Sequence, residues 1–192
     1  SGEEPITYGR LYSEALKVAA FLRRQNVLPN DTIALMFPTS LELLAAFFGV
    51  MFAGAVPVPL YPPASFERLA EHLKKQAAIL KNCEAKILLT VSEARLVGGV
   101  LKTYSPALEQ VFTPAGWENE ALPSDVSLPV ARKADDLAFL QYTSGSTGTP
   151  KGVMLTHENL LANIRAMGEV VRIKADDVFV GWLPLYHDMG LI

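Results

Sequence analysis

Apolar side chains recur along the chain with two different periods, one typical of helices and one of buried strands. Residues 7–26 place Leu11, Ala15, Ala19 and Leu22 on one helical face, which predicts an amphipathic helix. Strands that alternate with helices indicate an α/β fold with a mainly parallel, helix-covered sheet. Strand-like apolar runs lie at 32–37, 55–60, 85–90, 108–112, 137–143, 152–156 and 177–184, further helical patterns lie at 41–53, 66–83, 92–102 and 156–171, and a last element begins within 186–192.

Hydroxyl side chains and glycines mark the expected helix ends. Thr7, Ser40 and Ser65 each precede a helical pattern and are suited to cap its first turn. Gly54 follows the second of these helices, where glycine is the usual stop. Residues 113–134 contain several prolines and glycines but little periodicity, so we expect a long surface loop there.

The run at 43–60 carries no charge over 18 residues, which meets the length threshold for a membrane span. Gly49 and Gly54 interrupt it, and Pro57 and Pro59 would break a single helix. A buried helix followed by a short buried strand explains the same residues better. We therefore expect no transmembrane segment.

Composition and charge narrow the class of protein. Half of the residues are hydrophobic, 19% are charged and the net charge is −3, which suits a globular domain and gives nucleic acid no basic surface. Cys83 is the single cysteine, so no internal disulfide forms, and a cytoplasmic location is the simplest expectation. The three histidines show no zinc-site spacing. No signal peptide is visible, and Ser1-Gly2 does not resemble a natural start.

One loop, QYTSGSTGTPKG at 141–152, carries the clearest chemistry. Its glycines let backbone N–H groups converge on an anion, and hydroxyls together with Lys151 supply hydrogen bonds and positive charge to phosphate oxygens. It is not a Walker A loop, because Gly152 rather than Ser or Thr follows the lysine. A flexible Ser/Gly turn is the alternative. A position at the carboxyl end of a parallel strand favours phosphate binding. The candidate ligands are Thr143, Ser144, Gly145, Ser146, Thr147, Gly148, Thr149 and Lys151.

The string YTSGSTGTPKG resembles the signature loop of the acyl-adenylate-forming superfamily, which includes acyl-CoA synthetases, luciferases and adenylation domains of nonribosomal peptide synthetases. WLPLYHDMGLI at 182–192 resembles the next motif of that superfamily. This resemblance implies that His187 lies beside the substrate carboxylate and acts with Lys151 in catalysis. Asp188 either orients His187 or caps the following helix. The apolar helix at 41–53 either lines an acyl tunnel or, as we expect, belongs to the core.

The sequences of the motifs are most similar to those of fatty acyl-AMP ligases. LPLYHDMG at 183–190 and PVPLYPP at 57–63, followed by RLAEHLKKQ, carry this resemblance. It implies an enzyme that uses ATP and Mg²⁺ to convert a fatty acid into acyl-AMP. The acyl group then passes to the phosphopantetheine thiol of an acyl carrier protein, or of a polyketide or nonribosomal peptide synthase. An acyl-CoA synthetase, an amino-acid adenylation domain and a non-enzymatic scaffold are the alternatives.

By the same resemblance, these 192 residues form only part of the large N-terminal domain of such an enzyme. Residues 113–134 would then be the loop between its two halves. The adenine-binding, ribose-binding and magnesium-binding motifs of the family, and its small C-terminal domain, would follow residue 192. We therefore expect the 192 residues alone to lack turnover.

Overall fold

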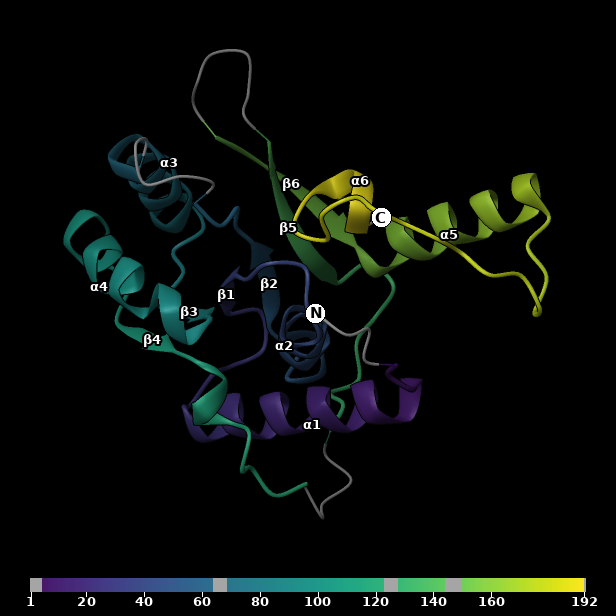
Figure 1. The fold of residues 1–192 in the computed structure, drawn as a ribbon, viewed down its shortest axis with the longest axis horizontal. Coiled ribbons are helices and arrows are strands. Elements are labelled where there is room, and N and C mark those ends of the chain that lie inside the picture. Colours follow the sequence, from purple (N-terminus) through teal and green to yellow (C-terminus); the bar gives the residue numbers. More distant parts are fainter. Residues whose placement is uncertain (1–4, 64–68, 123–127, 144–149, 192) are drawn as a thin grey trace.

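The computed structural model describes residues 5–63, 69–122, 128–143 and 150–191. Helices and strands alternate along this part of the chain, as the sequence predicts (Figure 1). The elements in chain order are α1 (Tyr8–Arg24), β1 (Thr32–Met36), α2 (Leu41–Phe52), β2 (Val56–Pro59), α3 (Leu69–Asn82), β3 (Ile87–Thr90), the 3-10 turn η1 (Ser92–Ala94), α4 (Arg95–Tyr104), β4 (Gln110–Phe112), the 3-10 turn η2 (Pro114–Gly116), β5 (Leu137–Thr143), β6 (Lys151–Thr156), α5 (His157–Val171) and α6 (Asp188–Leu191).

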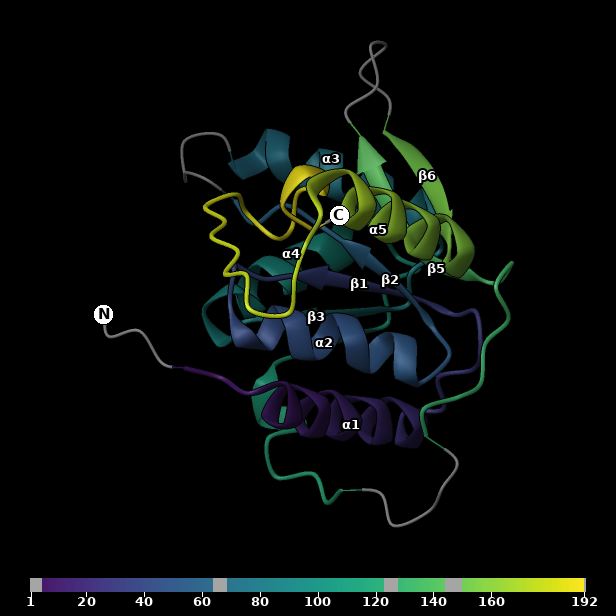
Figure 2. The same ribbon diagram turned by 90° about the vertical axis from the view of Figure 1, so that its right-hand side faces the viewer.

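Four strands form a parallel sheet in the order β2-β1-β3-β4, and helices cover both of its faces (Figure 2). Alternate residues of β1 point to opposite faces: Ile33 and Leu35 join a core cluster with α1 and α2, whereas Ala34 and Met36 join a second cluster with α3 and α4. This arrangement confirms the predicted α/β class. A parallel sheet covered on both sides explains why its strands are apolar at nearly every position.

The sheet ends at β2 because of two prolines. On the side that faces β1, the backbone N–H groups of Val56 and Leu60 donate hydrogen bonds to the carbonyl oxygens of Asp31 and Leu35. The alternate positions on the other edge of β2 are Pro57 and Pro59, which have no N–H to donate. Although β5 packs next to β2, it makes no ladder with it and pairs with β6 instead.

The helix starts predicted at Thr7 and Ser40 are confirmed, whereas the helical pattern at 92–102 begins as the 3-10 turn η1 and becomes an α-helix only at Arg95. Thr7 and Ser40 accept hydrogen bonds from backbone N–H groups in the first turns of α1 and α2. Thr156 forms a capping box with Asn159 at the start of α5. Ser65 lies outside the described residues. No helix in the described part of the chain is long and apolar enough to cross a bilayer, and α2 belongs to the core.

The strand predicted over 177–184 is wrong. No described strand pairs with this segment, and the Phe179 side chain is 94% exposed. Its apolar pattern suits a buried strand, but a strand forms only where a neighbour completes its hydrogen bonds and covers its side chains. The segment 113–134, expected to be a surface loop, also contains a buried residue. Trp117, to which the pattern gives no role, is 3% exposed and packs against the ring of Phe21.

Candidate functional site

The predicted phosphate loop connects the two strands of an antiparallel hairpin, β5 and β6. The register sets Thr143 directly opposite Lys151, with both residues exposed to solvent. A hydroxyl and a cation are therefore brought together at the base of the loop. The other predicted ligands lie outside the described residues: Ser144, Gly145, Ser146, Thr147, Gly148 and Thr149.

The hairpin corrects the expectation that the loop leaves a parallel strand. β5 pairs only with β6 in the described part of the chain, and the two strands are antiparallel. Loop length explains this, because parallel neighbours need a crossover of about a dozen residues or more, whereas residues 144–150 alone separate β5 from β6. The direction of β5 therefore gives no support for phosphate binding at this loop. Phosphate binding is still supported by the hydroxyl, glycine and lysine residues of the loop and by its resemblance to the signature loop of the acyl-adenylate-forming superfamily.

Tyr142 and Gly152 hold the base of the hairpin in place. They face each other across the strands, and a Cβ atom added at Gly152 would lie 2.9 Å from Cζ of the Tyr142 ring. The Tyr142 hydroxyl donates a hydrogen bond to Oδ1 of Asn82, the last residue of α3. Burial raises the pKa of Tyr142 to about 12, so the phenol keeps its proton and remains a donor. The loop thus starts from a strand end anchored to α3.

His187 lies at the carboxyl-end edge of the parallel sheet. The segment that carries it is held by Thr39, which follows β1: Oγ1 of Thr39 accepts a hydrogen bond of 3.0 Å from the Leu185 backbone N–H. Tyr61, which follows β2, also contacts this segment. The Tyr61 ring meets the rings of Tyr186 and His187 edge to face, at centroid distances of 5.8 and 5.7 Å. Open α/β sheets bind their ligands at this edge.

One nitrogen of the His187 imidazole has a defined partner. Nδ1 accepts a hydrogen bond of 3.3 Å from the backbone N–H of Met189, in the first turn of α6. A neutral ring that accepts at Nδ1 carries its proton on Nε2. The side chain of Asp188 lies outside the description, so both roles foreseen for it stay open.

Residues on either side of His187 and the hairpin belong to one core cluster. Leu185, Tyr186 and Leu191 pack against the core cluster that contains Phe139 of β5, and α6 lies in front of the hairpin in Figure 1. The segment that carries His187 therefore packs against a core cluster to which the hairpin also contributes.

Gln141 opens the loop motif but is not among the candidate ligands. It lies in β5 two residues before the end of the strand, its side chain is 2% exposed, and neither amide atom has a described hydrogen-bond partner. Most buried polar groups are paired, and those that are not often occur at functional positions. A signal existed in the sequence, because Gln141 interrupts the apolar run LAFLQYT.

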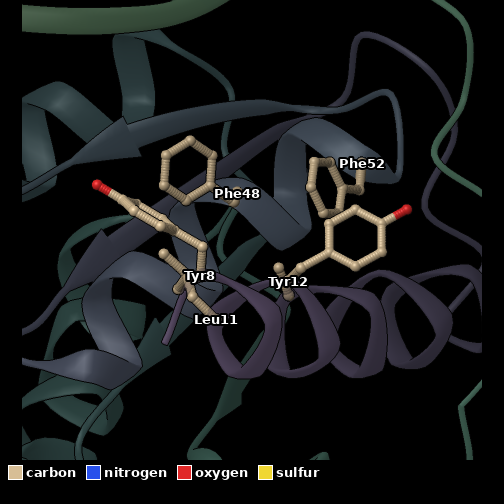
Figure 3. A pocket seen from close by; sticks show the side chains of 6 residues that line it. Tyr8, Leu11, Tyr12, Phe48 and Phe52 are labelled. Carbon is tan, nitrogen blue, oxygen red and sulfur yellow. The ribbon is translucent and has the colours of Figure 1, made fainter. Parts of the chain in front are cut away.

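A separate cavity of about 240 Å³ opens between α1 and α2 (Figure 3). Its walls are apolar and mostly aromatic, and the rings of Tyr12 and Phe52 meet there at a centroid distance of 5.4 Å. No charged side chain lines it, so it offers no anchor for a carboxylate or a phosphate. The lining residues are Tyr8, Leu11, Tyr12, Ala15, Phe48 and Phe52.

The described residues contain no group of three or more His, Cys, Asp or Glu that could hold a metal ion. The cationic and hydroxyl groups at the hairpin base suit an anion rather than a bare cation. Magnesium would therefore fit this part of the site only through the oxygens of a bound phosphate.

Comparisons with known proteins identify the family of the chain. The model of the AMP-binding enzyme family matches residues 1–192. The chain is 36% identical over 197 residues to the long-chain-fatty-acid–AMP ligase FadD26 of Mycobacterium marinum, covering 98% of this chain and 32% of that protein. It is also 36% identical over 191 residues to the medium-chain-fatty-acid–[acyl-carrier-protein] ligase JamA of Moorena producens, covering 97% of this chain and 31% of that protein.

Solved structures show the same likeness. A fatty acyl-adenylate ligase from a study of the Escherichia coli and Legionella pneumophila enzymes superposes with a TM-score of 0.88 at 34% identity, over all of this chain and 34% of the other. McyG A-PCP, complexed with phenylalanyl-adenylate, gives a TM-score of 0.85 at 29% identity, over 97% of this chain and 29% of the other. The chain spans about a third of the length of the curated relatives named above. It belongs to the AMP-binding enzyme family.

Proposed function

We propose that this chain supplies the phosphate-binding part of an enzyme that activates a fatty acid as acyl-AMP and passes the acyl group to a carrier-protein thiol. One observation carries the proposal: Thr143 and Lys151 face each other at the base of the signature loop, and residues beside His187 pack against the core cluster that includes Phe139 of β5. Similarity to fatty acid–AMP ligases and to a fatty acid–carrier-protein ligase supports the substrate and the acceptor.

In the first step, a carboxylate oxygen of the fatty acid attacks the α-phosphorus of ATP. A new O–P bond forms, the bond from the α-phosphorus to the bridging oxygen breaks, and pyrophosphate leaves with that electron pair. Lys151 would neutralise charge on the leaving pyrophosphate, and the Thr143 hydroxyl would donate to a phosphate oxygen. Bound Mg²⁺ would share the phosphate charge. Hydrogen bonds to charged groups contribute about 1.5–3 kcal/mol each.

His187 would act on the carboxylate. With Nδ1 accepting from Met189, the Nε2–H group of the neutral ring is the donor able to orient a carboxylate oxygen for attack. In the second step, a phosphopantetheine sulfur attacks the acyl carbonyl carbon. The thioester C–S bond forms, the acyl C–O bond to AMP breaks, and the thiol proton passes to solvent.

Product analysis tests the proposal in a protein of the relatives' length that carries this chain. The protein is incubated with ATP, Mg²⁺, mixed fatty acids, amino acids, carrier protein and CoA, and the products are identified by mass spectrometry. We expect acyl-AMP and acyl-carrier protein. Acyl-CoA in place of acyl-carrier would assign an acyl-CoA synthetase instead, aminoacyl-AMP would assign an amino-acid adenylation domain, and the absence of any adenylate would overturn the proposed reaction.

A further inference from the structure

The Tyr61 ring contacts the rings of both Tyr186 and His187. It is the second residue after β2, and the backbone just before it is still bound to the sheet, because the Leu60 N–H donates to the Leu35 carbonyl oxygen at 2.7 Å. Pro62 and Pro63 follow it, and proline fixes the backbone angle φ. The Tyr61 ring therefore starts from a well-fixed backbone.

The contacts of this ring have directional character. The plane of Tyr61 lies at 80° to the Tyr186 ring and at 65° to the His187 ring. Edge-to-face contacts favour particular ring orientations, unlike the packing of aliphatic side chains. One side chain therefore restricts the orientation of two successive rings in the segment that contains the proposed carboxylate-binding imidazole.

His72 interacts with the Tyr61 backbone. It lies on α3, and its imidazole hydrogen-bonds the Tyr61 backbone. Burial lowers the pKa of His72, against the smaller opposing effect of that hydrogen bond. The Nε2 atom of His72 is buried without a partner in the described part of the chain. A neutral imidazole with one nitrogen bonded to Tyr61 thus connects α3 to the loop after β2.

We propose that Tyr61 is a positioning residue that holds the His187 imidazole in the orientation needed for adenylation, with His72 fixing the Tyr61 backbone. The role in adenylation rests on the proposed function. The role in orienting His187 does not, and it is testable in the 192-residue chain.

The first experiment measures the tautomer of His187, which reports whether Nδ1 still accepts from the Met189 N–H group. Nitrogen-15 NMR of the chain at about pH 8, where an ordinary imidazole is neutral, reports which ring nitrogen carries the proton. We expect His187 to hold its proton on Nε2 in the wild type and in Tyr61→Phe, which keeps the ring. Tyr61→Leu should give a mixture of tautomers. An unchanged His187 tautomer in Tyr61→Leu would overturn the proposed positioning.

The second experiment measures adenylation in a protein of the relatives' length, by fatty-acid-dependent ATP–pyrophosphate exchange. Tyr61→Leu should lower kcat at least tenfold with little change in KM for ATP, and Tyr61→Phe should stay within threefold of wild type. His72→Leu should lower kcat less, and His72→Gln, whose amide can still hydrogen-bond the Tyr61 backbone, should recover part of that loss. Tyr104→Leu on the exposed surface of α4 is the matched control.

The outcomes separate the two proposals. A wild-type protein without exchange activity contradicts the proposed function, while the tautomer measurement still decides the positioning role. An active wild type in which Tyr61→Phe and Tyr61→Leu lose activity equally contradicts the ring contact as the cause. Full activity in Tyr61→Leu overturns the proposal outright.

Discussion

Replacing Gln141 by Leu should stabilise the folded chain. The Gln141 side chain is 2% exposed, and both amide atoms are buried without a described partner. A buried polar group without a hydrogen bond costs about 1–3 kcal/mol, whereas an apolar side chain of similar shape removes that cost. Leucine has one non-hydrogen atom fewer than glutamine, so a small packing loss offsets part of the gain. We expect a net rise of about 1–2 kcal/mol in the free energy of unfolding.

Urea unfolding followed by circular dichroism measures this change, and the unfolding temperature should rise by roughly 2–8 °C for a chain of this length. Gln110→Leu is the matched control, because Gln110 lies in β4 with its side chain exposed, and it should change stability by less than about 0.5 kcal/mol. A loss of 1 kcal/mol or more in Gln141→Leu would refute the reasoning, since it would mean that the amide is hydrogen-bonded in solution.

Three further predictions concern packing and ionisation. Gly49→Ala should cost about 1–3 kcal/mol in urea unfolding, because the added Cβ would lie 2.5 Å from Cβ of Val18; Gly99→Ala, with no atom within 4 Å, should not destabilise the chain. Burial raises the pKa of Cys83 to about 11, so the folded chain should react with iodoacetamide much more slowly than the urea-unfolded chain at neutral pH. Burial lowers the pKa of His72 below 6.5, so unfolding takes up a proton and stability should fall as the pH drops through about 6.5; His72→Gln should flatten part of that slope.

Local chemistry made much of the fold predictable. Cap residues such as Thr7 and Ser40 satisfy the first backbone N–H groups of a helix, so these two helix starts could be predicted from the sequence. The four parallel strands are apolar at nearly every position because both faces of their sheet are covered, and that pattern was also readable. These features depend on neighbours close in sequence or on simple burial.

Other features depend on partners that the pattern does not reveal. The segment 177–184 has the composition of a strand, but composition supplies no neighbouring strand. Trp117 is a lone apolar residue in an irregular segment, and its burial against Phe21 depends on how the chain returns across α1. The antiparallel hairpin could have been predicted from the sequence, because the loop between β5 and β6 is too short for a parallel crossover.

The candidate site was readable from its motifs only in part. The loop and His187 could be found from their sequence strings, and the structure adds the Thr143–Lys151 pairing and the contact of His187 with Tyr61. Tyr61 was readable as part of PVPLYPP but not as a neighbour of His187, because the two residues lie far apart in sequence. Only the fold brings the ends of β1 and β2 under the same segment.

The central claim is that Lys151 binds the phosphates of ATP during adenylation. Its most direct test is fatty-acid-dependent ATP–pyrophosphate exchange by Lys151→Ala in a protein of the relatives' length, with Lys102→Ala on α4 as the control. Loss of one charge-assisted hydrogen bond of about 1.5–3 kcal/mol predicts an exchange rate roughly 10- to 150-fold lower in Lys151→Ala and unchanged in Lys102→Ala. A Lys151→Ala enzyme that exchanges pyrophosphate at the wild-type rate would contradict the claim.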